Sequence, residues 1–199
     1  MNSFCGHLMM SDKSGLRKSI QSFSPSDEQE KRDKELMLLY LEQFPDILLR
    51  QNTLAHFTAS SWIVNPEKTK VLLIYHNTYD SWAWTGGHAD GEADLLRVAV
   101  KEAREETGVE LFQVLKDEPF SLEIICANGH YKRGEYVSSH LHLNLTYLLE
   151  ADENSALRIK EDENSGVRWA GLDEVFHLSS EPWMKKIYTK LNSKLNYLL

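Results

Sequence analysis

The sequence predicts an α/β fold of the α+β type, in which a mixed β-sheet is sandwiched between helices and preceded by a helical extension. Two observations predict it: several short β-rich runs follow one another, and two long helical patterns interrupt and close that series. The chain of 199 residues is long enough for one well-buried domain. We expect residues 1–52 to form an N-terminal arm and helical extension, and residues 53–199 to form the main domain.

The extension shows one clear helix. Residues 1–23 have no sustained period, which predicts a loose or partly helical arm. Ser26, with Gln29 three residues later, forms a capping-box pattern that predicts a helix start. The helix ends before Pro45, a short apolar helix is expected over 47–50, and one face of the first carries Leu36, Leu39, Tyr40 and Phe44. This lead-in packs either on the main domain or on a second subunit, so a homodimer is one expected partner arrangement.

The main domain begins with a hairpin signal, because the β-rich runs 56–64 and 70–76 flank an Asn-Pro-Glu-Lys turn. A third strand is expected over 81–85, ending at Gly86 and Gly87. A helix follows from about Glu92 to Thr107, and Gly108 suits a left-handed C-terminal cap. The remaining elements are three strands, at 121–127, 141–151 and 166–172, and a final helix, 182–195, with Trp183, Ile187 and Leu191 on one face.

Composition restricts the function classes. The formal net charge of −8 argues against a nucleic-acid polymer as partner, since phosphate neutralisation needs clustered Lys and Arg. No run approaches the roughly 20 apolar residues of a membrane span, and the first residues lack the apolar core of a signal peptide. Cys5 lies in the arm, so a disulfide with Cys126 is not expected and a reducing compartment fits. We therefore expect a soluble cytoplasmic protein without a membrane partner.

The segment from Gly86 to Val109 carries the chemistry. On a helix, Glu102, Glu105 and Glu106 stand at i, i+3 and i+4, so their carboxylates project from one face. Like charges at these spacings repel by about 0.2–0.5 kcal/mol per pair, and a bound divalent cation reverses the sign of that interaction. Carboxylate oxygens suit Mg²⁺, with Mn²⁺ as the alternative. A solvated acidic face is the plain alternative, but the ordered glycines and glutamates argue against it.

The segment resembles the Nudix box, Gly-x5-Glu-x7-Arg-Glu-U-x-Glu-Glu-x-Gly-U, where U is a bulky aliphatic residue. Gly87 to Val109 align with it without gaps, and the Glu-x-x-Glu-Glu cluster falls on its motif positions. Two positions depart: Ala93 replaces the first glutamate, which Glu92 or Asp90 can cover, and Lys101 replaces the arginine. The resemblance implies a Nudix-like sheet and helix arrangement over about residues 53–199.

The resemblance also implies the activity: a Mg²⁺-dependent hydrolase that cleaves a diphosphate linkage in a nucleoside diphosphate derivative or a nucleotide-like small molecule. It implies Glu102, Glu105 and Glu106 as metal ligands. For catalysis we expect Glu105, Glu106 and a later-loop glutamate, Glu163, with Glu161 as the alternative to Glu163. The expected partner is accordingly a small-molecule phosphate substrate.

Residues near the box are expected to bind substrate: Gly87, His88, Trp84 and His142. Trp84 is a candidate for stacking on a base, although at least one of Trp82 and Trp84 is expected in the core. His142 alternates with His140 along a polar strand face. A zinc site that adds His130 is conceivable, but a polar face lining the substrate cleft explains the alternation as well.

Two other functions use the same scaffold. One is a catalytically weakened Nudix-fold module that binds a nucleotide for regulation, as the departures at Ala93 and Lys101 suggest. The other is an isoprenoid-diphosphate isomerase, which needs a cysteine in the pocket, and Cys126 is the only plausible candidate.

Overall fold

The computed structural model of the protein describes residues 12–132 and 134–197. Its main sheet has eight strands in the order β10-β2-β1-β9-β5, with β3 beside β2, β4 beside β1 and β6 beside β9, and β7 and β8 form a separate ribbon. The strands are β1 Ala55–Val64, β2 Lys70–His76, β3 Ser81–Ala83, β4 Thr85–His88, β5 Gln113–Val114, β6 Ser121–Ala127, β7 His130–Lys132, β8 Glu135–Val137, β9 His140–Glu150 and β10 Asn164–Gly171. The predicted α+β class is confirmed.

The sheet is mixed because its two central strands, β1 and β9, run parallel over ten paired residues, Ala55↔Leu141 to Val64↔Glu150. All other neighbours are antiparallel. Strand β1 pairs with β2 at its C-terminal end, through Val64↔Val71. Nearer its middle, β1 pairs with β4, through Thr58↔His88 and Ser61↔Thr85. The chain therefore presents two different segments along the same edge of β1, and one of them carries the predicted glycines.

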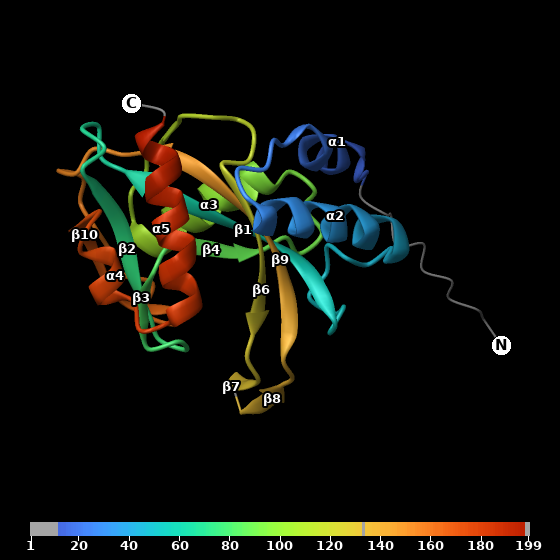
Figure 1. Ribbon diagram of the computed structural model, residues 1–199. Helices are drawn as coiled ribbons and strands as arrows, with labels where there is room; N and C mark the ends of the chain where they lie inside the picture. The colour runs from blue at the N-terminus through green and yellow to red at the C-terminus, as the bar shows by residue number, and fades with distance from the viewer. Residues whose placement is uncertain (1–11, 133, 198–199) are drawn as a thin grey trace.

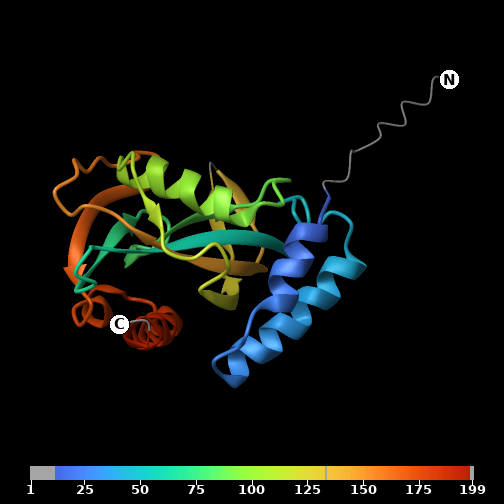
Figure 2. The same cartoon turned by 90° about the horizontal axis from the view of Figure 1, so that it is seen from above.

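Five helices cover the sheet, as Figures 1 and 2 show. They are α1 Ser14–Ser22, α2 Glu28–Gln43, α3 Leu95–Thr107, α4 Val175–Leu178 and α5 Pro182–Asn196. Seen from above, α3 lies on one side of the sheet and α5, viewed end-on, lies on the other (Figure 2). Buried Ala103 of α3 packs with Ile63 and Leu72, whereas Ile187 and Leu191 of α5 pack with Trp62. The predicted sandwich is thus present.

Several boundaries differ from the predicted ones. The third strand does not stop at the glycines: β4 continues to His88 because Gly86 and Gly87 pair with Ser60 and Ala59 of β1. The central helix begins at Leu95 and not near Glu92, since the Asp94 side chain accepts a hydrogen bond from the Arg97 N–H and caps it. Its C-terminal cap is confirmed, because Gly108 is left-handed at φ 74°.

The remaining corrections concern helix starts and faces. Asp27, and not Ser26, caps α2, because its carboxylate accepts from the Glu30 N–H at 2.8 Å. Residues 47–50 form turns and no helix. Trp183 is 48% exposed and so leaves the buried face of α5. The described part of the arm contains α1, while Cys5 lies outside the described residues.

The helical extension packs on the main domain. Leu16 and Ile20 of α1 and Met37 of α2 belong to the same buried cluster as Phe57 of β1 and Leu145 of β9. Helix α2 also lies along β6: Gln29 Nε2 donates to the Leu122 carbonyl at 2.9 Å, and the Ile124 N–H donates to Asp33 Oδ2 at 2.8 Å. Of the two packing arrangements left open by the sequence, the structure shows the one within the chain. A homodimer stays a prediction, as does the domain boundary at residue 53.

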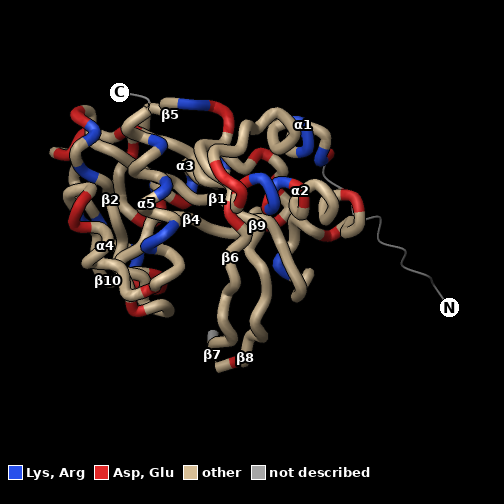
Figure 3. The backbone as a smooth tube through the Cα atoms, in the orientation of Figure 1, with Lys and Arg blue, Asp and Glu red and all other residues tan. Residues whose placement is uncertain are grey.

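Charged residues are distributed over the whole fold. Figure 3 shows Lys and Arg spread over several elements and interleaved with Asp and Glu. Within the described residues, none of the helices has the length and apolar character needed to cross a membrane.

Candidate active site

One cleft of about 390 Å³ gathers every residue that the sequence predicted for the site. The carboxylates come from α3 and from the loop before β10, and the remaining residues come from β3, β4, β9 and the connections between them. The residues that line it from the prediction are Trp84, Gly87, His88, Glu102, Glu105, Glu106, His142 and Glu163. A volume of this size suits a small-molecule ligand of nucleotide dimensions.

The two glycines of β4 face different neighbours. A Cβ atom at Gly86 would lie 2.7 Å from the Ala59 carbonyl oxygen of β1, a backbone contact that excludes any side chain there. A Cβ at Gly87 would lie 2.6 Å from Cδ of Glu102 on α3, so a larger residue there would displace the Glu102 carboxylate from its present place. The glycine at the start of the box thus has a structural reason: it provides the surface on which the Glu102 side chain lies.

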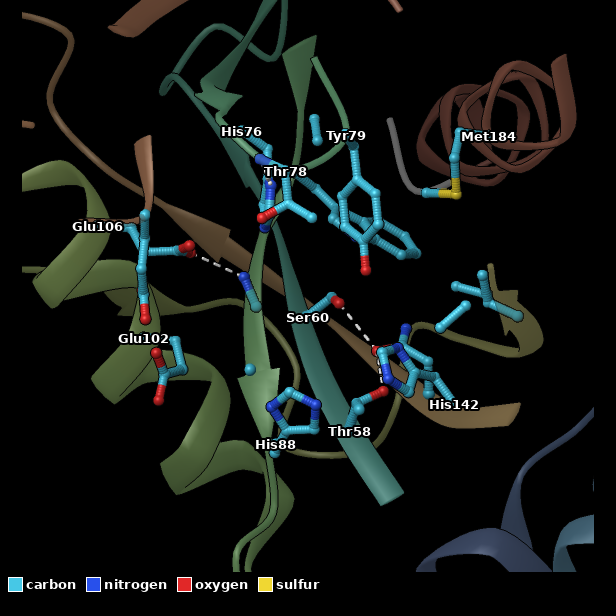
Figure 4. Close-up of a pocket in the computed structure, with 18 of the residues that line it drawn as sticks. Thr58, Ser60, His76, Thr78, Tyr79, His88, Glu102, Glu106, His142 and Met184 are labelled. Carbon is cyan, nitrogen blue, oxygen red and sulfur yellow. Dashed lines mark hydrogen bonds between the residues drawn. The ribbon is translucent and has the colours of Figure 1, made fainter. Parts of the chain in front are cut away.

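Glu106 is the most deeply buried carboxyl of the cleft, with 2% of its surface exposed. Its Oε2 accepts a hydrogen bond from the Gly86 N–H at 2.9 Å, and Figure 4 shows this side chain reaching from α3 toward β4. Burial raises the pKa of Glu106 well above its usual value, and the nearby Glu102 and Glu163 carboxylates raise it further. The single amide hydrogen bond does not compensate for this burial.

Two lysines connect the other carboxylates. Lys101 Nζ lies 2.9 Å from Glu102 and 3.0 Å from Glu105, which is four residues further along α3. Lys160 Nζ lies 3.1 Å from Glu105 and 2.8 Å from Glu163. The Lys101 hydrogen bond lowers the pKa of Glu105, and Lys160 adds to that effect against some burial. Three carboxylates, Glu102, Glu105 and Glu163, therefore share two ammonium groups, which leaves an excess of negative charge.

The remaining acidic candidates differ in whether they line the cleft. Glu163 lines the cleft, whereas Glu161 is not among the residues that line it. Asp90, one of two residues proposed to cover for Ala93, also lines the cleft and pairs with Arg50, whose Nε lies 2.7 Å from Asp90 Oδ1. That hydrogen bond lowers the pKa of Asp90. Glu92 instead pairs with Arg97, at 3.4 Å, away from the cleft lining.

The aromatic residues near the cleft differ in whether they line it or pack away from it. Trp84 lines the cleft but is 9% exposed, and its ring packs edge-on against Tyr188 with centroids 5.6 Å apart. Trp82 is not among the lining residues; it packs against Tyr75 and Arg168. Base stacking by Trp84 stays a prediction. Tyr79 also lines the cleft; it was not predicted, because it lies in the turn between β2 and β3, where no periodic pattern marks it.

Polar side chains of β1 and β9 form the floor of the cleft. Asn144 Oδ1 accepts hydrogen bonds from Thr58 Oγ1 at 3.0 Å and from Ser60 Oγ at 2.8 Å. All three are buried and line the cleft, which fits the prediction of a polar β9 face. The contribution from β1 was not predicted, because neighbouring residues of that strand on both faces are buried and the strand shows no alternation. Cys126, the cysteine named for the isomerase alternative, is exposed and lines the same cleft.

Histidines gather at the end of the cleft away from Glu106, where Figure 4 shows His88 and His142 near Thr58. Burial is the main reason that the pKa of His56 is lowered and that the pKa of His142 is lowered to about 2. His140 lies beside them, with its Nε2 3.0 Å from Nε2 of His142. The imidazoles of His56 on β1 and His142 on β9 therefore favour the neutral form, and His88 of β4 lies beside them.

The carboxylates fit a hard divalent cation. Oxygen ligands of this type are those that Mg²⁺ and Mn²⁺ prefer, and the unneutralised charge and the buried Glu106 carboxyl give such an ion a favourable place. Glu102 also lies directly on the glycine surface of β4, which leaves no room for a side chain there. Glu102, Glu105 and Glu106 are the residues that would hold it.

A mixed sheet between helices, with a carboxylate-bearing helix lying on a glycine strand above a cleft, defines an enzyme suited to phosphate chemistry. Residues 54–191 match the family model of the NUDIX domain. The chain belongs to the Nudix family and is a pyrophosphohydrolase of that type, a family whose enzymes generally use divalent metal ions.

Two mammalian proteins are similar to the chain in sequence. The bis(5'-nucleosyl)-tetraphosphatase (asymmetrical) of Mus musculus is 31% identical over 117 residues, which is 58% of this chain and 72% of that protein. The protein of the same name from Rattus norvegicus is 30% identical over 116 residues, again 58% of this chain and 72% of the relative.

Solved structures show the same fold at lower identity. A Nudix hydrolase from M. smegmatis, RenU, has a TM-score of 0.53 and 18% identity, covering 72% of this chain and 88% of its own. A NUDIX-family hydrolase from Clostridium perfringens has a TM-score of 0.51 and 19% identity, covering 72% of this chain and 98% of its own.

Proposed function

We propose that the protein is a Mg²⁺-dependent hydrolase that cleaves a diphosphate linkage within a nucleoside polyphosphate, and that a dinucleoside tetraphosphate is the first substrate to test. The observation that carries the proposal is a group of four carboxyl groups in one cleft. Three of them share two lysines, and the fourth, Glu106, accepts a hydrogen bond from the Gly86 N–H. The substrate class is supported by the names of the two mammalian relatives. Mn²⁺ is the alternative ion.

When bound, Mg²⁺ neutralises the diphosphate oxygens and polarises the attacking water. The chain's own residues perform the remaining tasks. Glu102, Glu105 and Glu106 hold the ion, and the Gly86 N–H orients the Glu106 carboxyl by its hydrogen bond. Thr58, Ser60 and Asn144 provide a preformed polar floor because they bond to one another. Phosphoryl transfer depends mainly on positioning and charge neutralisation, so this arrangement is sufficient.

Glu163 is our choice of general base. It comes from a different element than the α3 ligands, and one lysine, Lys160, contacts its carboxylate at 2.8 Å. Glu105 is contacted by two lysines, and the Lys101 hydrogen bond lowers its pKa, which weakens it as a base. Glu163 thus takes a proton from the attacking water, while the cleaved phosphorus–oxygen bond leaves a monophosphate and the shortened remainder of the substrate.

The test is turnover by the purified full chain with Mg²⁺ and with Mn²⁺. The panel contains a dinucleoside tetraphosphate, nucleoside triphosphates, a nucleotide sugar and isopentenyl diphosphate, with products separated by anion-exchange chromatography. We expect hydrolysis of a nucleoside polyphosphate, with at least about a 100-fold loss of kcat in Glu106→Gln, since a metal site supplies several kcal/mol. The matched control is Glu153→Gln, a carboxylate that pairs with Lys70 at 2.8 Å outside the cleft.

Three results contradict this proposal. Tight nucleotide binding without turnover with either ion identifies the regulatory module. Isomerisation of isopentenyl diphosphate that is lost in Cys126→Ala identifies the isomerase, a candidate that is retained in the panel because Cys126 lines the cleft. Hydrolysis that persists in Glu106→Gln also contradicts it, because the activity then belongs to another site.

A further inference from the structure

Three histidines from three different strands converge at one point beside the cleft. They are His56 of β1, His88 of β4 and His142 of β9, and one ring nitrogen of each lies within 4.8 Å of the other two. Strand β1 pairs with both of the other strands, with β4 through Thr58↔His88 and with β9 through His56↔His142. The backbone of the sheet therefore fixes the spacing of the three rings, independently of any loop.

His56 shows the feature that distinguishes a ligand site from a cluster of packed rings. Its Nδ1–H donates to the Asn52 carbonyl at 3.0 Å, which fixes the tautomer and leaves Nε2 unprotonated. Nε2 is buried and has no hydrogen-bond partner among the described residues, and the whole residue is 3% exposed. A metal-binding histidine characteristically donates its other ring N–H to a carbonyl in this way. A buried lone pair without a partner costs free energy unless a hydrogen-bond donor or a metal ion binds it.

A fourth ring supports the same arrangement from behind. His140 donates from Nδ1 to the Ser138 carbonyl at 2.8 Å, and its Nε2 accepts from Nε2 of His142 at 3.0 Å. This second bond leaves the other nitrogen of His142 unprotonated. Ring centroids of His140 lie 4.9 Å from those of both His56 and His142. The lone pairs on Nε2 of His56 and on the second ring nitrogen of His142 suit a cation better than an anion such as phosphate.

We propose that His56, His88 and His142 form a second metal site, selective for a divalent transition ion of the Zn²⁺ class and separate from the carboxylate site on α3. Imidazole ligands suit Zn²⁺, Cu²⁺, Ni²⁺ and Fe²⁺, whereas Mg²⁺ prefers the oxygen ligands of the glutamates. Zn–N bonds of about 2.0–2.1 Å place tetrahedral ligand nitrogens roughly 3.4 Å apart. Small rotations of the three side chains bring their nitrogens to that spacing from within 4.8 Å.

This set differs from the one that the strand alternation suggested. His130, from β7, is not part of the group of three, and the two added ligands come from strands in which the histidines are isolated in sequence. The site also places the two kinds of ligand along one cleft, since His88 directly follows Gly87, against which Glu102 lies. The proposal concerns ion binding alone and stands whether or not the proposed substrate is hydrolysed.

The experiment measures Zn²⁺ binding by the full chain, freed of metal by a chelator and kept in excess Mg²⁺ to occupy the carboxylates. Isothermal titration calorimetry is expected to show one equivalent of Zn²⁺, and Co²⁺ is expected to give the visible absorption of a nitrogen-ligated site. Losing a ligand costs at least the 10–100-fold that outer-shell changes cost, so His88→Gln and His142→Gln should each weaken Zn²⁺ by that factor or more. Both residues are half-buried, and circular dichroism checks their folding.

Two matched variants sharpen the result. His177→Gln, an exposed histidine of α4, and Glu106→Gln, a ligand of the other site, should each retain the single equivalent of Zn²⁺. Absence of Zn²⁺ binding in excess Mg²⁺ overturns the proposal. Binding that survives both folded histidine variants, or that disappears in Glu106→Gln, overturns it as well.

Discussion

Two buried glutamates, Glu30 and Glu106, occupy opposite electrostatic environments in this fold. Glu30 of α2 is fully buried, and it receives Lys194 Nζ at 2.6 Å, Lys190 Nζ at 3.4 Å and the Ser121 hydroxyl at 2.7 Å. Glu106 of α3 is nearly as buried but receives a single backbone N–H. Burial raises the pKa of both, yet the two lysines and the hydrogen bonds bring the pKa of Glu30 down to about 2, while that of Glu106 stays well above normal.

The two residues differ in how their charge is neutralised: lysines of the chain itself neutralise Glu30, whereas the described residues provide no such partner for Glu106. Glu30 is part of a closed network that joins the helical extension to α5, with Lys190 also 2.9 Å from Glu123. A buried ion pair of this kind has a desolvation cost that its partners must offset. Among the described residues, Glu106 forms no ion pair with a lysine or arginine, whereas the neighbouring Glu102, Glu105 and Glu163 do. We infer that the missing charge is the one that a metal ion supplies.

The largest expected effect follows from removing the negative charge of Glu30. Glu30→Gln leaves Lys190 and Lys194 buried with fewer partners, so we expect the free energy of unfolding to fall by about 3 kcal/mol. Urea unfolding followed by circular dichroism measures the loss, and kcat of the folded variant should change little. Glu35→Gln on the same helix is the control, because its pair with Arg32 is exposed and such pairs contribute roughly 0–1 kcal/mol. Equal losses in the two variants would contradict the comparison.

The same network predicts the response to acid. Since the folded pKa of Glu30 is about 2 and the usual value is 4.5, its contribution is complete above pH 4.5 and is lost as the pH falls through 2. The difference in unfolding free energy between the wild-type protein and Glu30→Gln should therefore shrink steadily over that window. Urea titrations at several pH values measure it. A difference that is constant from pH 7 to pH 2 shows that the carboxylate does not carry the effect.

Glu106 should show a smaller effect of the opposite sign. Its raised pKa means that the folded, metal-free protein holds a proton that the unfolded chain releases near pH 4.5, so this group's contribution to stability falls as the pH rises from there. Glu106→Gln keeps the neutral form and the acceptor for the Gly86 N–H. We expect the metal-free variant to melt about 2–4 °C above the wild type at neutral pH, and Mg²⁺ to stabilise only the wild type. Differential scanning calorimetry with a chelator, then with Mg²⁺, tests both statements.

The sequence predicted the acidic helix better than its surroundings, for a physical reason. Glu102, Glu105 and Glu106 are placed by the helical repeat alone, and their common cleft follows from it. Lys160 and Glu163 reach the same place through a loop whose path no local pattern encodes. The histidine group depends on the pairing of β1 with β4 and with β9. That pairing brings together residues such as His56 and His142, which are 86 residues apart in the chain, and no local pattern predicts it. Helix α3 also starts later than predicted because Asp94 offers a better cap than the preceding turn.

The contact of α2 with β6 has a consequence for how the protein is handled. Among the described strands, β6 pairs only with β9, and its outward backbone groups at Leu122 and Ile124 bond to Gln29 and Asp33. A chain shortened to the family-matched region would lack Gln29 and Asp33, so the backbone groups of β6 would lose these partners. An unpaired strand edge is a template for sheet extension between molecules. We therefore expect the shortened protein to self-associate. Low activity of such a preparation would then result from aggregation and not from damage to the active site.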